Sequence, residues 1–506
     1  MTKISNILPQ QAYSVKQVRE NEVKAAAELA IPIYELMLRA GNAAFALLNE
    51  RYKGVKSILV ICGKGNNGGD GFVVARLAKQ ADINVTVLLL TEQNTITGDA
   101  KSAMEEYCQQ GGEIYEVNNI KDVEKYYFQC DVDLIVDAIL GTGFNGILRA
   151  FYADVIEFVN QQSCSVLSLD IPSGLNADTG AISPIAINAD SCITFIALKQ
   201  GLLTGQAANY CGRLYFANLD VEVIFTQITQ SHIFLLNADS KPALPQRKPT
   251  SHKGDIGLVL TVGGGEGMPG AIRLSSEAAL RAGAALVAVC CLPQNQAMVF
   301  NGRPELMLAP DNITSLEISP IIAKAKTIVV GPGLGRNNWA KELYDYVNTL
   351  TEKTLVVDAD GLYFLAEQPN INPQRIITPH PKEASLLLNC TVADIEADRF
   401  AAVRQLANKY GGVCVLKGAG SLVSDGEQVW INTTGNAGMA SGGMGDVLSG
   451  IIAALSLQLP DLLAAVKLGV YLHGHAADIV AQQQGQCGML ASDLLLPLQA
   501  SVNGNI

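Results

Sequence analysis

The chain has 506 residues, enough for two to four domains at about 150 residues each. It carries 36 Lys and Arg against 48 Asp and Glu, and its 49% hydrophobic and 17% charged content is typical of globular rather than disordered proteins. Because an acidic chain without a long basic run is a poor ligand for duplex nucleic acid, we exclude nucleic acid as a partner. The 11 cysteines form no Cys-x-x-Cys pair and the N-terminus has no apolar stretch of signal-peptide length, so we expect no zinc knuckle, no membrane partner and a cytoplasmic location.

Short apolar runs alternate with helical patterns along the first half. The runs are continuously apolar, which predicts an α/β fold with a parallel sheet covered by helices on both faces. The predicted strands are 57–62, 84–90, 134–139, 165–170, 190–196 and 213–217, and a helix is expected after the Gly-rich turn that follows the first of them, over 72–80.

The alternation lapses between residues 228 and 254, where proline and basic residues cluster, and then starts again. A proline-rich, polar stretch of this kind is typical of a domain boundary. We therefore predict an N-terminal domain over 1–228, a linker over 229–250 and a second α/β domain over 251–506. In the second domain the predicted strands are 257–262, 285–291, 327–330, 354–358, 375–378 and 413–417, and the predicted helices are 271–282 and 446–455.

Polar residues follow three predicted strands of the first domain. The turn GKGNNGGDG formally fits a dinucleotide fingerprint but is unusual in holding Asn66, Asn67 and Asp70 together. Asp137 and Asp170 end two other strands, and Ser173 lies three residues after Asp170. Ligands of parallel sheets bind beyond the carboxyl ends of the strands, which favours a binding site here. Each residue taken singly could instead be a helix or turn cap.

The motifs NNGGDG, VDAILGTGFNG and LDIPSGLNADTG together resemble the epimerase domain of the NAD(P)H-hydrate repair enzymes, the YjeF N-terminal family, over about residues 10 to 225. The resemblance implies a Rossmann-like, doubly wound domain that epimerises hydrated NADH and NADPH, with Asp170 as the catalytic acid or base. It implies K⁺ bound by oxygens of Asn67, Asp137 and Ser173. The implied substrate contacts are Asn66, Asn67, Gly68, Gly69, Asp70, Gly141, Thr142, Gly143, Phe144, Asn145, Gly146, Ile147 and Asp170.

The second domain contains a glycine-rich run that ends at Asp446, directly before a helical pattern. Successive glycines allow backbone N–H groups to converge on an anion, and a helix N-terminus adds to that attraction. Asp446 would then lie beside a bound phosphate, where a base is useful, although a capped helix start is the simpler alternative. The chain has no G-x-x-x-x-G-K-[ST] motif, so a P-loop is excluded.

SHKGDIG, GPGLG, DADGL, TPHPKE, LKGAGS and GNAGMASGGMGD together resemble the ADP/ATP-dependent NAD(P)H-hydrate dehydratases of the ribokinase-like superfamily over about 250 to 493. The resemblance implies Asp446 as the catalytic base, Mg²⁺ with ADP or ATP as co-substrate, and ADP as the preferred nucleotide. The implied hydrate contacts are Ala271, Gly333, His380 and Asp446, and the implied nucleotide contacts are Lys417, Gly418, Ala419, Gly420, Ser421, Thr434, Gly435, Asn436, Ala437, Gly438, Met439, Ala440, Ser441, Gly442, Gly443, Met444 and Gly445. Lys417 could instead be a solvated charge and His380 a satisfied loop histidine.

Three functions fit these motifs. The first is a bifunctional repair enzyme, expected to be a homo-oligomer, in which one domain interconverts the R and S hydrates and the other dehydrates the S form to NADH or NADPH, giving AMP and phosphate. The second is a ribokinase-like small-molecule kinase with an accessory domain, which would release a phosphorylated metabolite. The third is a non-catalytic nucleotide sensor or assembly module, against which the intact Asp137, Asp170 and Ser173 argue.

Overall fold

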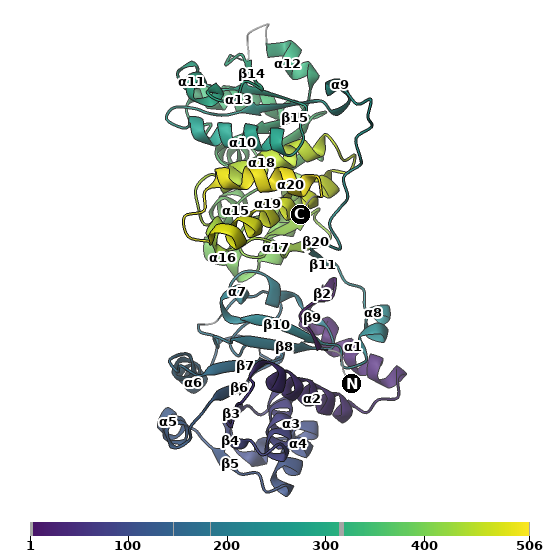
Figure 1. Ribbon diagram of the computed structural model, residues 1–506, viewed down its shortest axis with the longest axis vertical. Coiled ribbons are helices and arrows are strands. Elements are labelled where there is room, and N and C mark those ends of the chain that lie inside the picture. Colours follow the sequence, from purple (N-terminus) through teal and green to yellow (C-terminus); the bar gives the residue numbers. More distant parts are fainter. Residues whose placement is uncertain (1–3, 145, 183, 313–317, 505–506) are drawn as a thin grey trace. The chain divides into compact units, whose positions relative to one another are not determined.

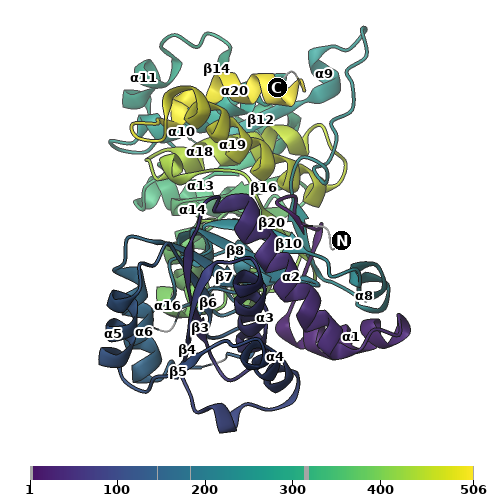
Figure 2. The same ribbon diagram turned by 60° about the horizontal axis from the view of Figure 1, so that its bottom comes forward.

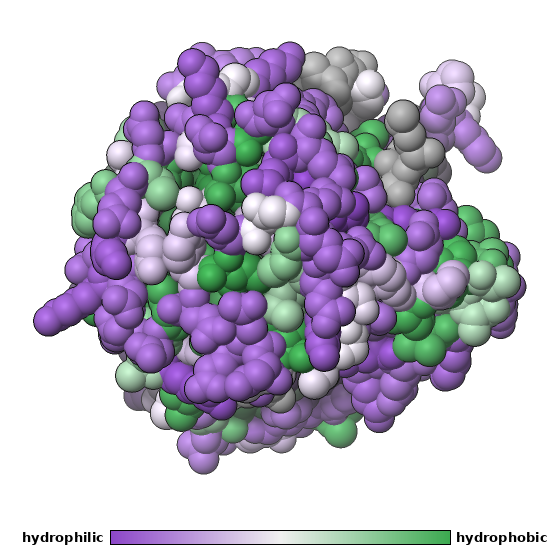
Figure 3. All heavy atoms as spheres, turned by 90° about the horizontal axis from the view of Figure 1, so that it is seen from below, coloured by the Kyte–Doolittle hydropathy of each residue, from purple (hydrophilic) through white to green (hydrophobic). Residues whose placement is uncertain are grey.

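The computed structural model describes residues 4–144, 146–182, 184–312 and 318–504. They divide into two compact units, Met1–Ile233 and Phe234–Ile506 (Figure 1). Both units are α/β, as the sequence predicts. Within the described residues no helix combines the length and apolar character that crossing a membrane requires. Hydrophilic side chains cover most of the surface in Figure 3, with hydrophobic ones scattered among them.

The first unit is built on a largely parallel sheet in which only β1 runs antiparallel to its neighbour. Its strand order is β1 (Ile4–Ser5), β10 (Arg213–Ala217), β8 (Ser191–Phe195), β7 (Ser165–Leu169), β6 (Leu134–Ala138), β3 (Ser57–Cys62), β4 (Asn84–Leu89) and β5 (Ile114–Glu116). Its helices are α1 (Val15–Glu28), α2 (Ile33–Arg51), α3 (Asn66–Gln80), α4 (Gly98–Gln109), α5 (Ile120–Gln129), α6 (Ala150–Asn160), α7 (Ala207–Tyr210) and α8 (Glu222–Ile228). Two further short strands of this unit, β2 (Gln11–Tyr13) and β9 (Leu198–Lys199), pair parallel with each other and are not part of this sheet.

Both faces of this sheet are covered, because successive residues of β3 enter different cores. Ile58, Val60 and Cys62 pack with α1 to α4, whereas Leu59 and Ile61 pack with α5 and α6. Figure 2 shows α2, α3 and α4 on one side of the strands and α5 and α6 on the other.

One boundary prediction in this unit is wrong. Helix α3 begins at Asn66 rather than Phe72, so the polar turn is the first part of the helix. Glycine normally disfavours helices by about 1 kcal/mol, but here tertiary packing requires it. A Cβ on Gly68 would collide with the carbonyl oxygen of Gly63, and one on Gly71 would come within 2.6 Å of Ala138 Cβ.

The second unit carries a mixed sheet. Its order is β14 (Leu306–Ala309), β13 (Leu286–Cys290), β12 (Leu258–Val262), β15 (Ala325–Val330), β16 (Thr354–Val357), β17 (Arg375–Ile377), β18 (Val413–Leu416), β19 (Leu422–Ser424), β20 (Val429–Asn432) and β11 (Ile233–Leu236). The strands from β14 to β18 are parallel, and β18, β19 and β20 pair antiparallel, which the apolar runs did not predict. Strand β11 lies inside the proline-containing stretch 229–250.

Helices cover this sheet as well. They are α9 (Lys253–Ile256), α10 (Pro269–Arg281), α11 (Gln296–Phe300), α12 (Ile318–Lys324), α13 (Asn338–Asn348), α14 (Asp360–Glu367), α15 (Pro381–Leu388), α16 (Val392–Ala397), α17 (Arg399–Tyr410), α18 (Met444–Ser456), α19 (Leu462–Gln484) and α20 (Leu495–Val502). Helices α10 and α18 touch closely, because Gly450 leaves no side chain against the carbonyl oxygen of Ser275. This contact fixes the start of α18 near the strand ends.

Candidate active sites

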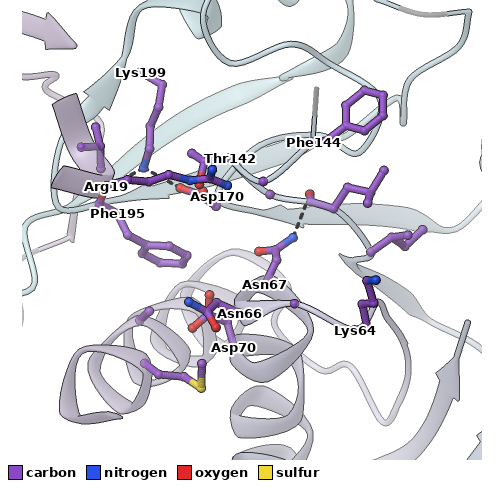
Figure 4. Close-up of a pocket in the computed structure, with 18 of the residues that line it drawn as sticks. Arg19, Lys64, Asn66, Asn67, Asp70, Thr142, Phe144, Asp170, Phe195 and Lys199 are labelled. Atoms are coloured by element: carbon purple, nitrogen blue, oxygen red, sulfur yellow. Dashed lines mark hydrogen bonds and ion pairs between the residues drawn. The ribbon is translucent and has the colours of Figure 1, made fainter. Parts of the chain in front are cut away.

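A cavity of about 520 Å³ opens in the first unit, at the carboxyl ends of the central strands. Figure 4 shows its wall, with Asn66, Asn67 and Asp70 on α3 facing Asp170 and Lys199. The predicted residues that line it are Asn66, Asn67, Asp70, Gly141, Thr142, Gly143, Phe144, Ile147 and Asp170. Gly68 and Gly69 are buried within α3, Gly146 is exposed in the same loop as Phe144, and Asn145 lies outside the described residues.

Asp170 follows β7 directly and has φ +63°, a left-handed conformation that Asp tolerates better than most residues. Its Oδ1 accepts a hydrogen bond from Lys199 Nζ at 2.6 Å and one from Thr194 Oγ1 at 3.3 Å. Its Oδ2 accepts no hydrogen bond from the residues that the structure describes, and a Cβ on Gly141 would lie 3.5 Å from it. Asp170 therefore offers one free carboxylate oxygen to the cavity.

Two further acids that line this cavity have raised pKa values. Burial raises the pKa of Asp70 well above its usual value, and the nearby Asp170 and Glu22 carboxylates raise it further. Burial also raises the pKa of Glu22, on α1, to about 7, although Lys199 and Arg19 oppose that effect. Proton-transfer groups whose pKa lies near neutrality are typical of active sites.

Behind the cavity wall lies a buried polar cluster around Asp137. Its carboxylate accepts hydrogen bonds from Ser173 Oγ at 2.5 Å, the Ser173 backbone N–H at 2.9 Å, Ser168 Oγ at 2.8 Å and the Ile139 N–H at 3.2 Å. Burial raises the pKa of Asp137, and these hydrogen bonds oppose the rise. Asn67 Nδ2 donates to the Leu140 carbonyl at 3.0 Å, while the buried Asn67 Oδ1 has no hydrogen-bond partner among the described residues. The three residues predicted to hold K⁺ therefore meet beside one carbonyl, which Ser173 Oγ also contacts at 3.2 Å.

The second unit gathers charged residues at the carboxyl ends of β16, β17 and β18. Asp358 follows β16, Glu383 lies in the first turn of α15 after β17, and Lys417 follows β18. Lys417 Nζ lies 3.0 Å from Asp358 Oδ1 and 3.7 Å from Glu383 Oε2. Burial lowers the pKa of Lys417, but the carboxylates outweigh burial and hold its pKa above the usual value. Lys417 is thus a permanent cation within the site rather than a solvated surface charge.

Asp446 lies in the first turn of α18, which begins at Met444. Burial raises its pKa to about 7, Asp358 and Glu383 raise it as well, and Lys417 opposes them. The Asp446 side chain accepts no hydrogen bond from the described part of the chain. A half-buried carboxylate with free lone pairs and a near-neutral pKa is suited to accept a proton at physiological pH.

The glycine-rich run leads into this helix. Gly443 has φ +89° and is the N-cap of α18, and a Cβ on Gly445 would lie 3.1 Å from Lys417 Nζ. Backbone N–H groups of a helix N-terminus and a lysine ammonium thus lie together, an arrangement that attracts phosphate. Of the remaining predicted residues, Ala437, Gly438 and Met439 form a 3-10 turn, Ala440, Ser441 and Gly442 connect it to α18, and Gly418 to Ser421 form the turn between β18 and β19.

Helix α19 holds the start of the run in place. Asp478 accepts hydrogen bonds from the Gly435 N–H and from Asn436 Nδ2, both at 2.9 Å, and Thr434 Oγ1 lies 3.0 Å from the Tyr471 carbonyl.

Ala271, Gly333 and His380 complete the predicted hydrate contacts. Gly333 has φ +57°, and a Cβ on it would lie 3.1 Å from Ala271 Cβ, so these two residues adjoin. His380 is the N-cap of α15 and its Nδ1 accepts from the N–H groups of Lys382 and Glu383 at 3.1 and 3.2 Å. This cap satisfies one ring nitrogen of His380 and leaves Nε2 3.5 Å from Glu383 Oε1.

Comparisons with known proteins give matches to both halves of the chain. Residues 33–201 match the family described as YjeF-related protein N-terminus, and residues 259–499 match NAD(P)H-hydrate dehydratase. The bifunctional NAD(P)H-hydrate repair enzyme of Escherichia coli is 44% identical over 501 residues, 99% of this chain and 95% of that protein. The chain belongs to the bifunctional NAD(P)H-hydrate repair enzymes.

A second member of this repair-enzyme family, from Vibrio cholerae, is 42% identical over 98% of this chain and 99% of its own length. A ribokinase-like superfamily protein from Enterococcus faecalis aligns in structure with a TM-score of 0.51 at 26% identity, over 55% of this chain and 98% of that one. The ribokinase-like fold predicted for the second half is therefore confirmed, as is the α/β class of the whole repair enzyme.

The structure of the repair enzyme also brings in residues that the motifs did not single out. In the first unit these are Glu22, Thr194 and Lys199, and in the second they are Asp358 and Glu383. The sequence could have pointed to Lys199, because it is a lone charged residue at the end of the apolar run CITFIAL. Nothing in the sequence could have pointed to Glu22, since it lies on an N-terminal helix whose pattern is that of an ordinary solvent-exposed helix.

Proposed function

We propose that this enzyme interconverts the R and S hydrates of NADH and NADPH in its first unit, and dehydrates the S form in its second unit with ADP, or ATP, as co-substrate. The observation that carries the dehydration is the free carboxylate of Asp446 beside the N–H groups of α18 and the Lys417 ammonium. The domain limits that go with this proposal are 1–228 and 251–506.

In the first unit the cavity would hold the hydrated nicotinamide dinucleotide along residues 66–70 and 141–147, with the reacting ring at Asp170. The carbon to be inverted carries the hydroxyl group and adjoins the ring nitrogen, whose lone pair weakens the C–O bond. Only a positioned acid or base is then needed, and the free Oδ2 of Asp170 would exchange the proton of that hydroxyl group.

In the second unit the hydroxyl group of the S hydrate would give its proton to Asp446 as it attacks the terminal phosphoryl group of the nucleotide. The N–H groups of residues 442–445 and Lys417 would stabilise the transferring phosphoryl, since positioning and charge stabilisation supply most of such catalysis. Phosphate then leaves from carbon with electrons from the ring nitrogen, and loss of a proton from the neighbouring ring carbon restores the double bond of the dihydropyridine. Bound Mg²⁺ would accompany the nucleotide phosphates and neutralise their charge, keeping much of its coordination as water and phosphate oxygen.

Potassium fits the polar cluster behind the first cavity. Asp137 is fully buried and forms no ion pair with a Lys or Arg of the described residues. The buried Asn67 Oδ1 has no hydrogen-bond partner among them, while Asn67 Nδ2 and Ser173 Oγ both contact Leu140 O. Carboxylate, amide, carbonyl and hydroxyl oxygens are the ligands that hard cations prefer. Asn67, Asp137 and Ser173 would hold the ion, and its charge would offset that of Asp137.

Potassium should therefore stabilise the fold. We expect the melting temperature to rise with KCl but not with LiCl at equal ionic strength, because a ligand bound only by the folded state stabilises it. Asn67→Leu should lose this response, and the neighbouring exposed Asn66→Leu should keep it. The measurement is thermal unfolding without substrate, and an equal response of wild type to both salts would contradict the K⁺ site.

A mixture of R and S hydrates tests the whole proposal. With the enzyme and ADP, the absorbance of the reduced nicotinamide should return to the amplitude of the full mixture, since one unit supplies the epimer that the other consumes. ATP is compared in parallel. The first unit's role would be contradicted if only the S fraction were converted rapidly and the R fraction followed no faster than it epimerises spontaneously. A stable phosphorylated product without NADH or NADPH would indicate a kinase, and no turnover would favour a non-catalytic module.

The all-thiol state of the cysteines supports a cytoplasmic location, because buried free thiols such as Cys62 and Cys414 suit a reducing compartment. A homo-oligomer stays a prediction, which sedimentation of the full chain would decide.

A further inference from the structure

Lys199 is the most deeply buried charged group of the first cavity. Its side chain is 2% exposed, and it lies at the end of β9, directly behind Asp170. Nζ donates to Asp170 Oδ1 at 2.6 Å, to Thr194 Oγ1 at 3.1 Å and to the Phe195 carbonyl at 2.8 Å. An ammonium has three donors, so all of them are engaged within the protein and none is left for a ligand.

The same contacts decide which oxygen of Asp170 is available. Lys199 and Thr194 both bind Oδ1, and Thr194 also accepts from Lys199, so the three side chains form a closed ring of hydrogen bonds. Oδ2 is left on the cavity side, toward Gly141. Figure 4 shows Lys199 reaching Asp170 from the side opposite Asn67 and Asp70.

We propose that Lys199 is the positioning residue of the first site: it holds Asp170 with Oδ1 engaged and Oδ2 aimed at the hydrated ring. The inference rests on the proposed epimerase function and deepens it. Lys199 acts through Asp170 and does not touch the substrate.

The surrounding charges make this cation necessary. Asp70 on α3, Glu22 on α1 and Asp99 on α4 line the same cavity as Asp170. The other cations that line it are Arg19, Lys64 and Arg149. Like charges disfavour ionisation of one another, and an opposite charge at hydrogen-bond distance reverses that effect. Without Lys199, Asp170 would lose the shorter of its two Oδ1 hydrogen bonds, and its carboxylate would be freer to rotate among these acids.

Lys199→Met tests the inference in the full-length enzyme. We expect kcat for epimerisation to fall about 100-fold, the usual cost of a misplaced catalytic group, while KM changes little. Lys199→Arg keeps the charge and hydrogen-bond donors toward Asp170 Oδ1, so this variant should recover part of the rate. Lys79→Met, an exposed lysine on α3, is the matched control and should behave as wild type.

A second comparison separates positioning from a general structural effect. In the Asp170→Asn background, adding Lys199→Met should lower the residual rate no further, because a residue that acts through Asp170 has nothing left to position. If Lys199→Met does not fold, Lys199→Arg replaces it in both comparisons, with a reduced kcat and a nearly unchanged KM as the expected result.

The inference is overturned if the folded Lys199 variants keep wild-type kcat, or if the two substitutions multiply in the double variant. Either result leaves the epimerase assignment standing, provided that the wild type epimerises. A wild type that does not interconvert the hydrates would instead remove the proposed function itself.

Discussion

Asp446→Asn is expected to stop dehydration of the S hydrate while the nucleotide still binds. The amide cannot accept the hydroxyl proton, and loss of a general base costs about 10²- to 10⁴-fold in rate. Nucleotide binding should survive, because the N–H groups of α18 and the Lys417 ammonium remain. Turnover is followed by the absorbance of the reduced nicotinamide, and ADP binding by calorimetry.

The fold should tolerate this change. Asp446 accepts no hydrogen bond from the described residues, and it lies near Asp358 and Glu383, whose charges raise its pKa. Removing the charge therefore relieves repulsion, and the melting temperature should stay equal or rise. Asp461→Asn is the control, since Asp461 also begins a helix, α19, but is exposed and caps it as asparagine would. Undiminished turnover in Asp446→Asn would remove Asp446 from the mechanism.

The pH dependence gives the same assignment a second measurement. With a pKa of about 7, Asp446 is mostly protonated below that value and mostly ionised above it. The base must be ionised, so kcat/KM for dehydration should rise from pH 6 to pH 8, since this parameter reports on the free enzyme. An ordinary carboxylate would titrate near 4 and leave the rate flat over this range. Such a flat profile in the wild type would contradict Asp446 as the base.

Much of the second site could be predicted because its residues are consecutive. The run of glycines before Asp446 and the strand-terminal Lys417 are readable as motifs, and parallel strands necessarily bring β16, β17 and β18 to one edge. The sequence could not predict which charged side chains pair with one another at the ends of these strands. The Lys417 contacts with Asp358 and Glu383 join residues dozens of positions apart, and they decide the charge balance at Asp446.

In the first site, local sequence patterns predicted the structure less well. Glycines in the polar turn predict a loop from local propensity, but the helix extends back to Asn66 because its backbone packs directly on neighbouring strands. Likewise, Lys199 reads as the end of an apolar strand, and only the fold places it behind Asp170. Tertiary contacts override local preference in both cases.

Asp170→Asn is expected to abolish interconversion of the R and S hydrates, lowering the rate by about 10²- to 10⁴-fold. Asparagine suits the test because it adopts the φ of +63° at least as well as aspartate and its amide oxygen can still accept from Lys199 Nζ. Loss of the charged partner should lower the free energy of unfolding by roughly 1–3 kcal/mol, within what the fold tolerates. The measurement is the rate at which a purified epimer regains the equilibrium mixture, with the nucleotide withheld.

The matched control is Asp82→Asn. Asp82 lies in the same unit and also has a positive φ, +58°, but it is exposed and does not line the cavity. The Asp82→Asn variant should epimerise the hydrates at the wild-type rate. Binding of a dinucleotide to Asp170→Asn should persist, since residues 66–70 and 141–147 are unchanged, so loss of rate with retained binding assigns Asp170 to the chemistry. Full activity in Asp170→Asn would exclude it, and the raised pKa of Glu22, about 7, would then make that carboxyl the next acid or base to replace.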